Sequence, residues 1–179
     1  MSRMFQVLGL MVALAVSGSA ADLVSIKMCA NKDYLVTKKE CAPGKALEGS
    51  NIVVAPDGGV MNVLTGIKTD MPEEIYHVWI FGGKATIKTI TVYDSATKTM
   101  REAGQSDLDW LKERKIEGAR AIVKMTVTPA ANYRIRSQKT LTAGSAGPWK
   151  VQVYDSTNTM PIGEIDFAVT PKDAGITEE

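Results

Sequence analysis

Alternation of apolar and polar side chains over the last third of the chain most constrains its fold. The apolar side chains that recur at every second position are Ala121, Val123, Met125 and Val127, then Trp149, Val151 and Val153, then Ile165, Phe167 and Val169. A period of two residues places such side chains on one face of a β-strand. Short strands at near-regular spacing, separated by polar turns, predict a mainly β chain folded as an antiparallel, immunoglobulin-like β-sandwich.

Earlier segments extend the same pattern. Residues 75–81 are apolar on both faces, which predicts a central strand. Gly82-Gly83 indicates a turn, and the β-branched residues 86–93 after it predict a strand that forms a hairpin with residues 75–81. Residues 53–54 and 60–64 flank a Pro-Asp-Gly-Gly turn and predict strand, tight turn, strand.

One stretch, residues 106–115, is typical of a helix. Ser106 suits the N-cap, with Asp109 three residues later as in a capping box. Basic residues gather at the other end, where they complement the helix dipole, and Gly118 suits the stop. We expect this short helix to dock on the edge of the sheet. Trp110 lies off the face that Leu108 and Leu111 share, so we expect it to be exposed.

The first 21 residues have the pattern of a signal peptide. Arg3 precedes an apolar run over residues 5–16, and five small residues follow. We place the cut after Ala21, and a cut after Ala20 fits nearly as well. The alternative is an uncleaved anchor, for which the run falls short of the roughly 20 residues that span a bilayer. The chain then divides into a signal peptide (1–21), an irregular lead-in (22–52), the β-sandwich (53–171) and a flexible tail (172–179).

The chain has two cysteines, Cys29 and Cys41, and both lie in the lead-in. In an exported chain such a pair is most simply a structural disulfide. A redox-active pair usually has the C-x-x-C spacing, which is much closer. A zinc site needs more ligands than a single histidine, His77, can add. We therefore predict a disulfide and no metal.

The charge balance excludes two classes of partner. Removing the signal peptide removes Arg3 and no acid, which leaves 20 lysines and arginines against 20 acids. A balanced charge without a basic cluster argues against nucleic acid and against binding to anionic membrane. The mature chain contains no second long apolar run, so we expect no transmembrane segment in it.

Four short motifs resemble one known family. Residues 77–79 read H-x-W, and residues 134–139 read R-x-x-S-x-K. Residues 147–155 read G-x-W-x-V-x-V-x-D, and residues 163–169 supply a final G and F-x-V. Together, over about residues 60–170, they resemble the bacterial domain of unknown function numbered twenty-nine fourteen. The resemblance implies an exported or membrane-associated β domain with no assigned chemistry.

Two features depart from the family pattern. Ile135 and Arg136 stand where the family often has an aromatic residue. Residues 95–120, with the predicted helix, resemble an insertion into the compact pattern.

No catalytic constellation stands out in the sequence. Residues 143–147 resemble a nucleophile elbow, but Ala143 replaces the first glycine and the turn leads into a strand. The acids lack calcium-loop spacing, and no phosphate-binding or dinucleotide fingerprint is present. A catalytic pair of carboxylates, as in a glycosidase, remains an alternative, because any two acidic residues could come together in the fold. We predict a protein that is not an enzyme and needs no cofactor.

Seven side chains are the candidates for binding: His77, Trp79, Trp110, Arg134, Arg136, Lys139 and Trp149. Trp79 and Trp149 either lock the two sheets together or form a platform for sugar rings or partner side chains. His77 is either a hydrogen-bonded core residue or a ligand contact. The cations of residues 134–139 either protect an edge strand or, with His77, form a polar patch for an acidic group of a partner.

These residues leave two functions open. The first is an exported binding or adaptor module that works through protein–protein contacts in the bacterial envelope, with another envelope protein as partner. The second is a carbohydrate or cell-wall binding module that uses aromatic stacking and the cationic strand on a glycan. We expect a periplasmic location, with secretion or the cell surface as the alternative.

Overall fold

The structure is a computed structural model that describes residues 21–47, 52–54, 59–83 and 89–170. The predicted signal peptide, apart from Ala21, and the tail from residue 171 lie outside the described residues, so both stay predictions. Among the described residues, no helix is long and apolar enough to cross a membrane.

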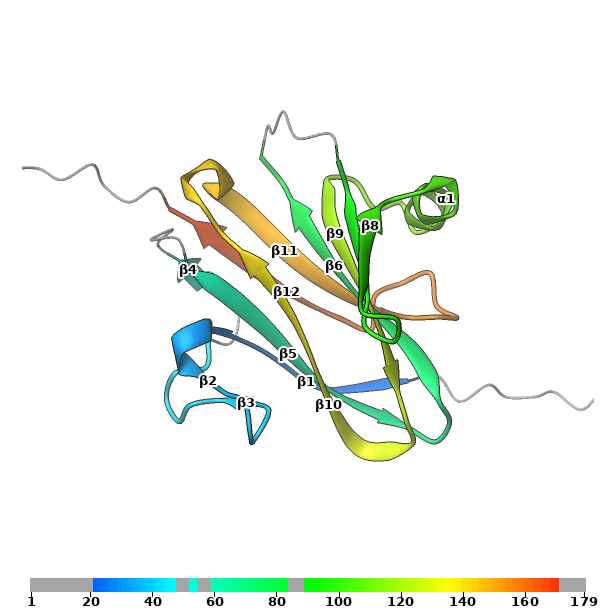
Figure 1. Cartoon of the computed structure of the whole chain (residues 1–179), viewed down its shortest axis with the longest axis horizontal. Coiled ribbons are helices and arrows are strands. Elements are labelled where there is room, and N and C mark those ends of the chain that lie inside the picture. The colour runs from blue at the N-terminus through cyan, green and yellow to red at the C-terminus, as the bar shows by residue number, and fades with distance from the viewer. Residues whose placement is uncertain (1–20, 48–51, 55–58, 84–88, 171–179) are drawn as a thin grey trace, which may run out of the picture.

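Two β-sheets pack face to face, which confirms the predicted mainly β sandwich with one short helix (Figure 1). The smaller sheet has the strand order β1-β5-β10, and its strands are β1 (Asp22–Ala30), β5 (Val60–Thr69) and β10 (Ala130–Thr140). The larger has the order β4-β12-β11-β6-β9-β7-β8, with β4 (Ile52–Val54), β6 (Glu73–Phe81), β7 (Thr91–Asp94), β8 (Thr99–Glu102), β9 (Ala119–Val127), β11 (Gly147–Asp155) and β12 (Gly163–Val169).

Strand pairing corrects two of the predicted hairpins. β6 is central, as predicted, but its two neighbours are β9 and β11, so no edge is left for residues 86–93. β7 pairs instead with β8 and, in parallel, with β9. β4 and β5 also lie in different sheets, because β4 pairs in parallel with β12. The sandwich is therefore antiparallel except for these two parallel pairs.

The lead-in is less irregular than predicted, because its first nine residues are β1. This strand pairs with β5 along its length, from Asp22 opposite Lys68 to Ala30 opposite Met61. Ala21, just before the strand, is 3% exposed and belongs to the hydrophobic core. The smaller sheet of the sandwich therefore starts well before residue 53.

After β1 the chain forms a small lobe, residues 31–47, which we call the disulfide lobe. It contains a 3-10 turn η1 (Asn31–Asp33) and the short strands β2 (Tyr34–Leu35) and β3 (Glu40–Cys41). The predicted disulfide between Cys29 and Cys41 is confirmed, with the two Cα atoms 6.0 Å apart. The lobe lies beside the smaller sheet, on the face turned away from the core (Figure 1).

The helix α1 (Gln105–Glu113) is present, but its cap and its docking differ from the prediction. Gly104 is the N-cap, and the Asp107 carboxylate accepts a hydrogen bond of 2.8 Å from the Gly104 N–H. Ser106 therefore lies inside the helix. Leu111 packs with residues of β6, β7, β9 and β11 in a second hydrophobic cluster, so α1 covers the outer face of the larger sheet and not its edge.

Candidate functional site

The single histidine joins the two sheets inside the core. His77 of β6 is fully buried, and its Nε2 lies 3.0 Å from Thr65 Oγ1 of β5. Its Nδ1 lies 2.8 Å from Ser137 Oγ of β10, which also accepts a 3.1 Å hydrogen bond from Trp79 Nε1. Burial lowers the pKa of His77 to about 3. His77 is therefore a neutral, hydrogen-bonded core residue, as the first of its two interpretations expected.

This arrangement does not form a reactive centre. Thr65, His77 and Ser137 are all buried, and the imidazole contacts hydroxyls rather than an orienting carboxylate. In the described part of the chain, no group of three or more histidine, cysteine or acidic side chains could hold a metal ion.

Trp79 and Trp149 pack in the core between the sheets. Trp79 is fully buried and Trp149 is 5% exposed. The Trp149 and Phe167 rings stack with centroids 6.2 Å apart, and Trp79 meets Phe167 edge-on at the same distance. The Trp149 Nε1–H donates to the Ser145 carbonyl at 2.7 Å. Trp79 is therefore closed to a ligand, and Trp149 is almost entirely covered.

Trp110 is half-buried, so the expected exposed contact is corrected. Its ring lies 4.9 Å from that of Tyr76 and 5.5 Å from that of Tyr154, measured between centroids. The Arg114 guanidinium covers it at 4.2 Å. Trp110 therefore fixes α1 to the larger sheet, whereas Leu108, predicted to share a face with Leu111, is exposed.

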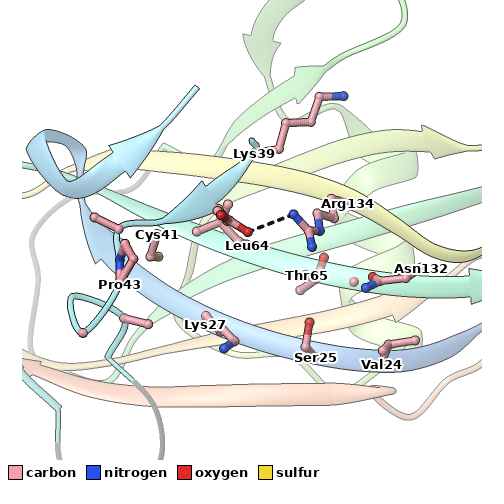
Figure 2. Close-up of a pocket in the computed structure, with 15 residues that line it drawn as sticks. Val24, Ser25, Lys27, Lys39, Cys41, Pro43, Leu64, Thr65, Asn132 and Arg134 are labelled. Carbon is pink, nitrogen blue, oxygen red and sulfur yellow. Dashed lines mark hydrogen bonds and ion pairs between the residues drawn. The ribbon is translucent and has the colours of Figure 1, made fainter. Parts of the chain in front are cut away.

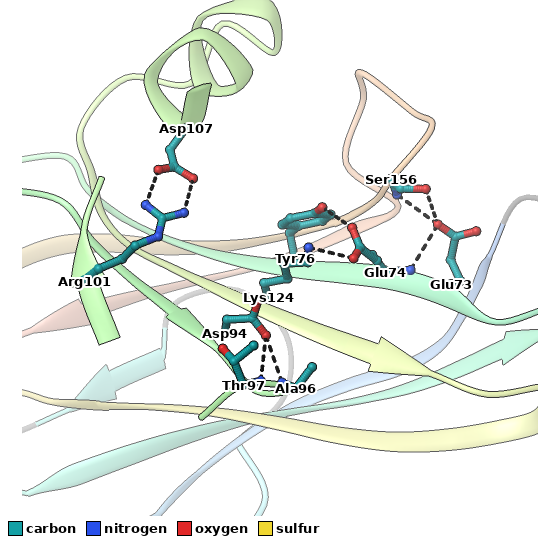
Figure 3. A network of polar contacts seen from close by, with 10 residues as sticks. All are labelled: Glu73, Glu74, Tyr76, Asp94, Ala96, Thr97, Arg101, Asp107, Lys124 and Ser156. Atoms are coloured by element: carbon teal, nitrogen blue, oxygen red, sulfur yellow. Dashed lines mark hydrogen bonds and ion pairs between the residues drawn. The ribbon is translucent and has the colours of Figure 1, made fainter. Parts of the chain in front are cut away.

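Charged groups near α1 pair with one another (Figure 3). Lys124 Nζ lies 2.6 Å from a Glu74 carboxylate oxygen, and the other oxygen of Glu74 accepts a 2.7 Å hydrogen bond from the Tyr76 hydroxyl. Burial, followed by this bond, raises the pKa of Tyr76 well above its usual value. Arg101 forms a two-pronged pair with Asp107 of α1. This network therefore fixes the helix and offers little charge to a partner.

The structure does not bring the predicted patch together. Arg134 and Arg136 point away from the core, Lys139 lies on the opposite face of β10, and His77 is buried between the sheets. Arg134 pairs with Glu40 at 3.1 Å and donates to the Lys38 carbonyl at 2.9 Å. The Arg136 guanidinium lies 4.5 Å from the centre of the Tyr34 ring. The two arginines therefore hold the disulfide lobe to the sheet.

A hollow of about 490 Å³ lies where the disulfide lobe meets the smaller sheet, and we call it the lobe groove (Figure 2). Leu64 and Gly66 of β5 form its floor. Besides β5, three parts of the chain line it: Val24, Ser25 and Lys27 of β1, Asn132 and Arg134 of β10, and Lys39 to Gly44 of the lobe.

Gly66 leaves room for two polar side chains above the floor of the groove. A Cβ atom at this position would collide with the Asn132 side-chain oxygen and lie 2.9 Å from Ser25 Oγ. The absence of a side chain on β5 therefore keeps a hydroxyl and an amide side by side above the strand.

The described residues that line the lobe groove carry charges of both signs. Lys27, Lys39 and Arg134 are the basic ones, and Glu40, which pairs with Arg134, is the acidic one. Of these cations, sequence reasoning found only Arg134, because the others lie on segments that come together only in the fold. The glycine inside an otherwise buried strand was the one local signal of the groove.

Comparison with known families supports part of the motif resemblance. A family model described as a protein of unknown function, DUF2914, matches residues 108–169. This match confirms, over that range, the family that the sequence motifs resemble. The match contains Arg134, Ser137, Lys139 and Trp149, whereas His77 and Trp79 fall outside it. It begins within α1, so residues 108–120 belong to the matched pattern and not to an insertion.

No curated protein matches the chain. Solved structures that resemble it include Pseudomonas fluorescens alkylpurine DNA glycosylase AlkC bound to DNA containing an abasic site analog, with 9% identity and a TM-score of 0.40 over 86% of this chain and 31% of that one. The Bifidobacterium adolescentis GH3 beta-glucosidase has 10% identity and a TM-score of 0.34, over 84% and 17%. The chain thus spans less than a third of either protein, and these likenesses carry no functional argument.

Proposed function

We propose that this chain is a non-enzymatic binding module of the bacterial envelope that acts through protein–protein contact. Its contact site is the lobe groove, which receives an acidic segment of the partner. The observation that carries this proposal is that Arg134 binds a carboxylate in the groove, that of Glu40, and that a second cation, Lys39, lines the same groove.

The groove suits a peptide better than a small charged molecule. Ser25 and Asn132 offer a hydroxyl and an amide next to the floor, and these groups can bond the backbone of a bound segment. Leu64 adds an apolar surface at the floor for its side chains. Arg134 forms an ion pair with the Glu40 carboxylate of the lobe, so one acidic group is already bound within the groove.

The carbohydrate alternative has less support. Sugar-binding modules of the expected kind stack exposed aromatic rings on the ligand, but Trp79 and Trp149 are core residues and Trp110 is wedged between two tyrosines. We therefore keep the protein–protein hypothesis as the function of this chain. The disulfide supports an oxidising compartment and so an exported protein.

The test measures binding of a fluorescent hexaglutamate peptide to the chain without residues 1–21. We expect binding that weakens as salt rises, because the attraction is between exposed charges. Lys39→Glu reverses a charge in the groove and is expected to abolish most of the binding. Lys68→Glu is the matched control, since this exposed lysine lies on β5 outside the groove.

Equal loss in Lys39→Glu and Lys68→Glu would show that only net charge matters and would overturn the assignment of the groove. Absence of binding by the unaltered chain would also count against an acidic partner. If hexaglutamate binds, photo-crosslinking from Lys39 in intact envelopes then identifies the natural partner.

A further inference from the structure

A second cationic hollow lies at one end of the sandwich, apart from the lobe groove. We call it the end pocket. It has a volume of about 250 Å³ and is lined by side chains of five strands, among them Phe81 of β6, Arg120 of β9, Lys139 of β10 and Trp149 of β11. Lys139 points to the face of β10 opposite Arg134, so the two hollows are separate.

Two cations share this pocket without an acid. Each lies against an aromatic ring, with the Arg120 guanidinium 5.6 Å from the centre of Phe81 and Lys139 Nζ 5.5 Å from that of Trp149. Both are half-buried, and no aspartate or glutamate of the described residues lines the pocket. Burial, and then the charge of Arg120, lower the pKa of Lys139.

Arg120 also has hydrogen-bonding capacity left over. Its Nη1 donates to the Ala119 carbonyl at 3.1 Å, but its buried Nε has no hydrogen-bond partner. A buried donor without a partner costs free energy, and so do two like charges brought close together away from water. A negatively charged group between the two cations would remove the cost of bringing them together.

Hydroxyl groups complete the wall of the end pocket. Thr91, Thr140, Thr142 and Ser145 all line it. Hydroxyls donate hydrogen bonds to oxygen acceptors, and guanidinium and ammonium groups form their strongest hydrogen bonds with phosphate and carboxylate. The pocket therefore combines the donors that an oxyanion needs.

We propose that Arg120 and Lys139 bind a small oxyanion, the phosphate or carboxylate group of a low-molecular-weight ligand. The volume suits one such group with a short organic part and is too small for a folded partner. This site is independent of the proposed function, because it uses neither the disulfide lobe nor the outer face of β10.

The experiment titrates the chain without residues 1–21 with inorganic phosphate or with acetate, at constant ionic strength set by chloride. Amide NMR signals are followed at each step. We expect saturable shifts at Thr140, Thr142 and Ser145 for at least one anion, and whichever binds tighter identifies the natural group as phosphate or carboxylate. Bound anion should also raise the pKa of the Lys139 ammonium, which side-chain NMR measures directly.

Variants then assign the site. Lys139→Gln and Arg120→Gln should each weaken binding by about tenfold or more, the loss of one charge-assisted hydrogen bond. Lys68→Gln, which removes the same charge elsewhere, should bind like the unaltered chain. If Arg120→Gln does not fold, the site is assigned from Lys139→Gln and from the positions of the shifted amide signals in the unaltered chain.

Three outcomes would overturn the proposal: no saturation by either anion, shifts that map away from the end pocket, or equal weakening by Lys68→Gln. In any of these cases the two cations serve only to cover Phe81 and Trp149. Hexaglutamate binding to Lys139→Gln separates the two sites, since it should remain unchanged whether or not the end pocket binds an anion.

Discussion

Ser137 Oγ of β10 lies 2.8 Å from His77 Nδ1 of β6, so a hydrogen bond crosses the core between the two sheets. The Trp79 N–H donates to the same oxygen. Ser137 therefore has its own proton to donate to Nδ1, and the imidazole N–H at Nε2 can donate to Thr65. This pattern requires a neutral histidine.

The first prediction is that His77 makes stability depend on pH near neutrality. Its pKa is about 3 in the folded chain and about 6.5 when unfolded, so the unfolded state binds more protons between these values. The free energy of unfolding therefore has its full value above about pH 6.5. Below that pH it falls, by up to about 1.4 kcal/mol per pH unit. Urea unfolding between pH 7.5 and 5.5 measures this fall in stability, in a pH range where most carboxylates do not yet titrate.

The matching variant is His77→Gln, which keeps a polar side chain but cannot be protonated. We expect it to be less stable at pH 7.5 and to lose most of the pH slope in this window. An unchanged slope would mean that another group is responsible.

The second prediction concerns the serine itself. Ser137→Ala leaves the Trp79 N–H and His77 Nδ1 without a partner in the core, and each unsatisfied group costs about 1–3 kcal/mol. We expect the free energy of unfolding, measured with a chemical denaturant, to fall by about 2–4 kcal/mol for the two groups together. Gln138→Ala, at the exposed neighbouring position, is the control and should change stability by less than about 0.5 kcal/mol. Similar losses in both variants would contradict the special role of Ser137.

The third prediction separates the tryptophans. Trp149→Ala should cost about 3–5 kcal/mol, because it empties the stack against Phe167 in the core. Trp110→Ala should cost less and act locally, since the ring is half-buried under α1. Thermal unfolding gives the difference between the two variants. A larger loss for Trp110→Ala would show that α1 contributes more to the fold than the inter-sheet stack.

The fourth prediction concerns the disulfide lobe. A Cys29→Ser, Cys41→Ser variant should lose about 3 kcal/mol, the expected effect of closing a short loop. It should also bind hexaglutamate less tightly, because the lobe forms one side of the groove. Non-reducing mass spectrometry of the unaltered chain should find no free thiol. Full hexaglutamate binding by the double variant would show that the salt bridge between Arg134 and Glu40 is enough to hold the lobe.

Local sequence patterns predicted the parts of the fold that depend on nearest neighbours. Alternation identified β9, β11 and β12, and the pair of cysteines in an exported chain identified the disulfide. Strand order was harder, because β6 carries no local signal that its partners are β9 and β11, which lie many residues further on. The helix cap moved from Ser106 to Gly104 because Asp107, not Asp109, reaches back to the preceding N–H.

The candidate sites depended even more on distant residues. The alternation along β10 separates Lys139 from Arg134 and Arg136, which the sequence could indicate. It could not indicate that the lobe would cover the two arginines, or that Arg120 would approach Lys139 across two sheets. Arg134 and Lys139, which look like parts of one patch along the chain, line two separate hollows in space.

On the proposed export route, the position of β1 limits when the predicted signal peptide can be removed. Strand pairing starts at Asp22, and Ala21, which the predicted cut would remove, packs in the core of the uncleaved chain, so no spacer separates the folded sheet from the predicted cleavage point. A peptidase needs an extended, accessible segment at its cut. On the proposed export route, β1 would therefore stay unpaired until the signal peptide is removed, and its addition to β5 would be a late step that follows processing.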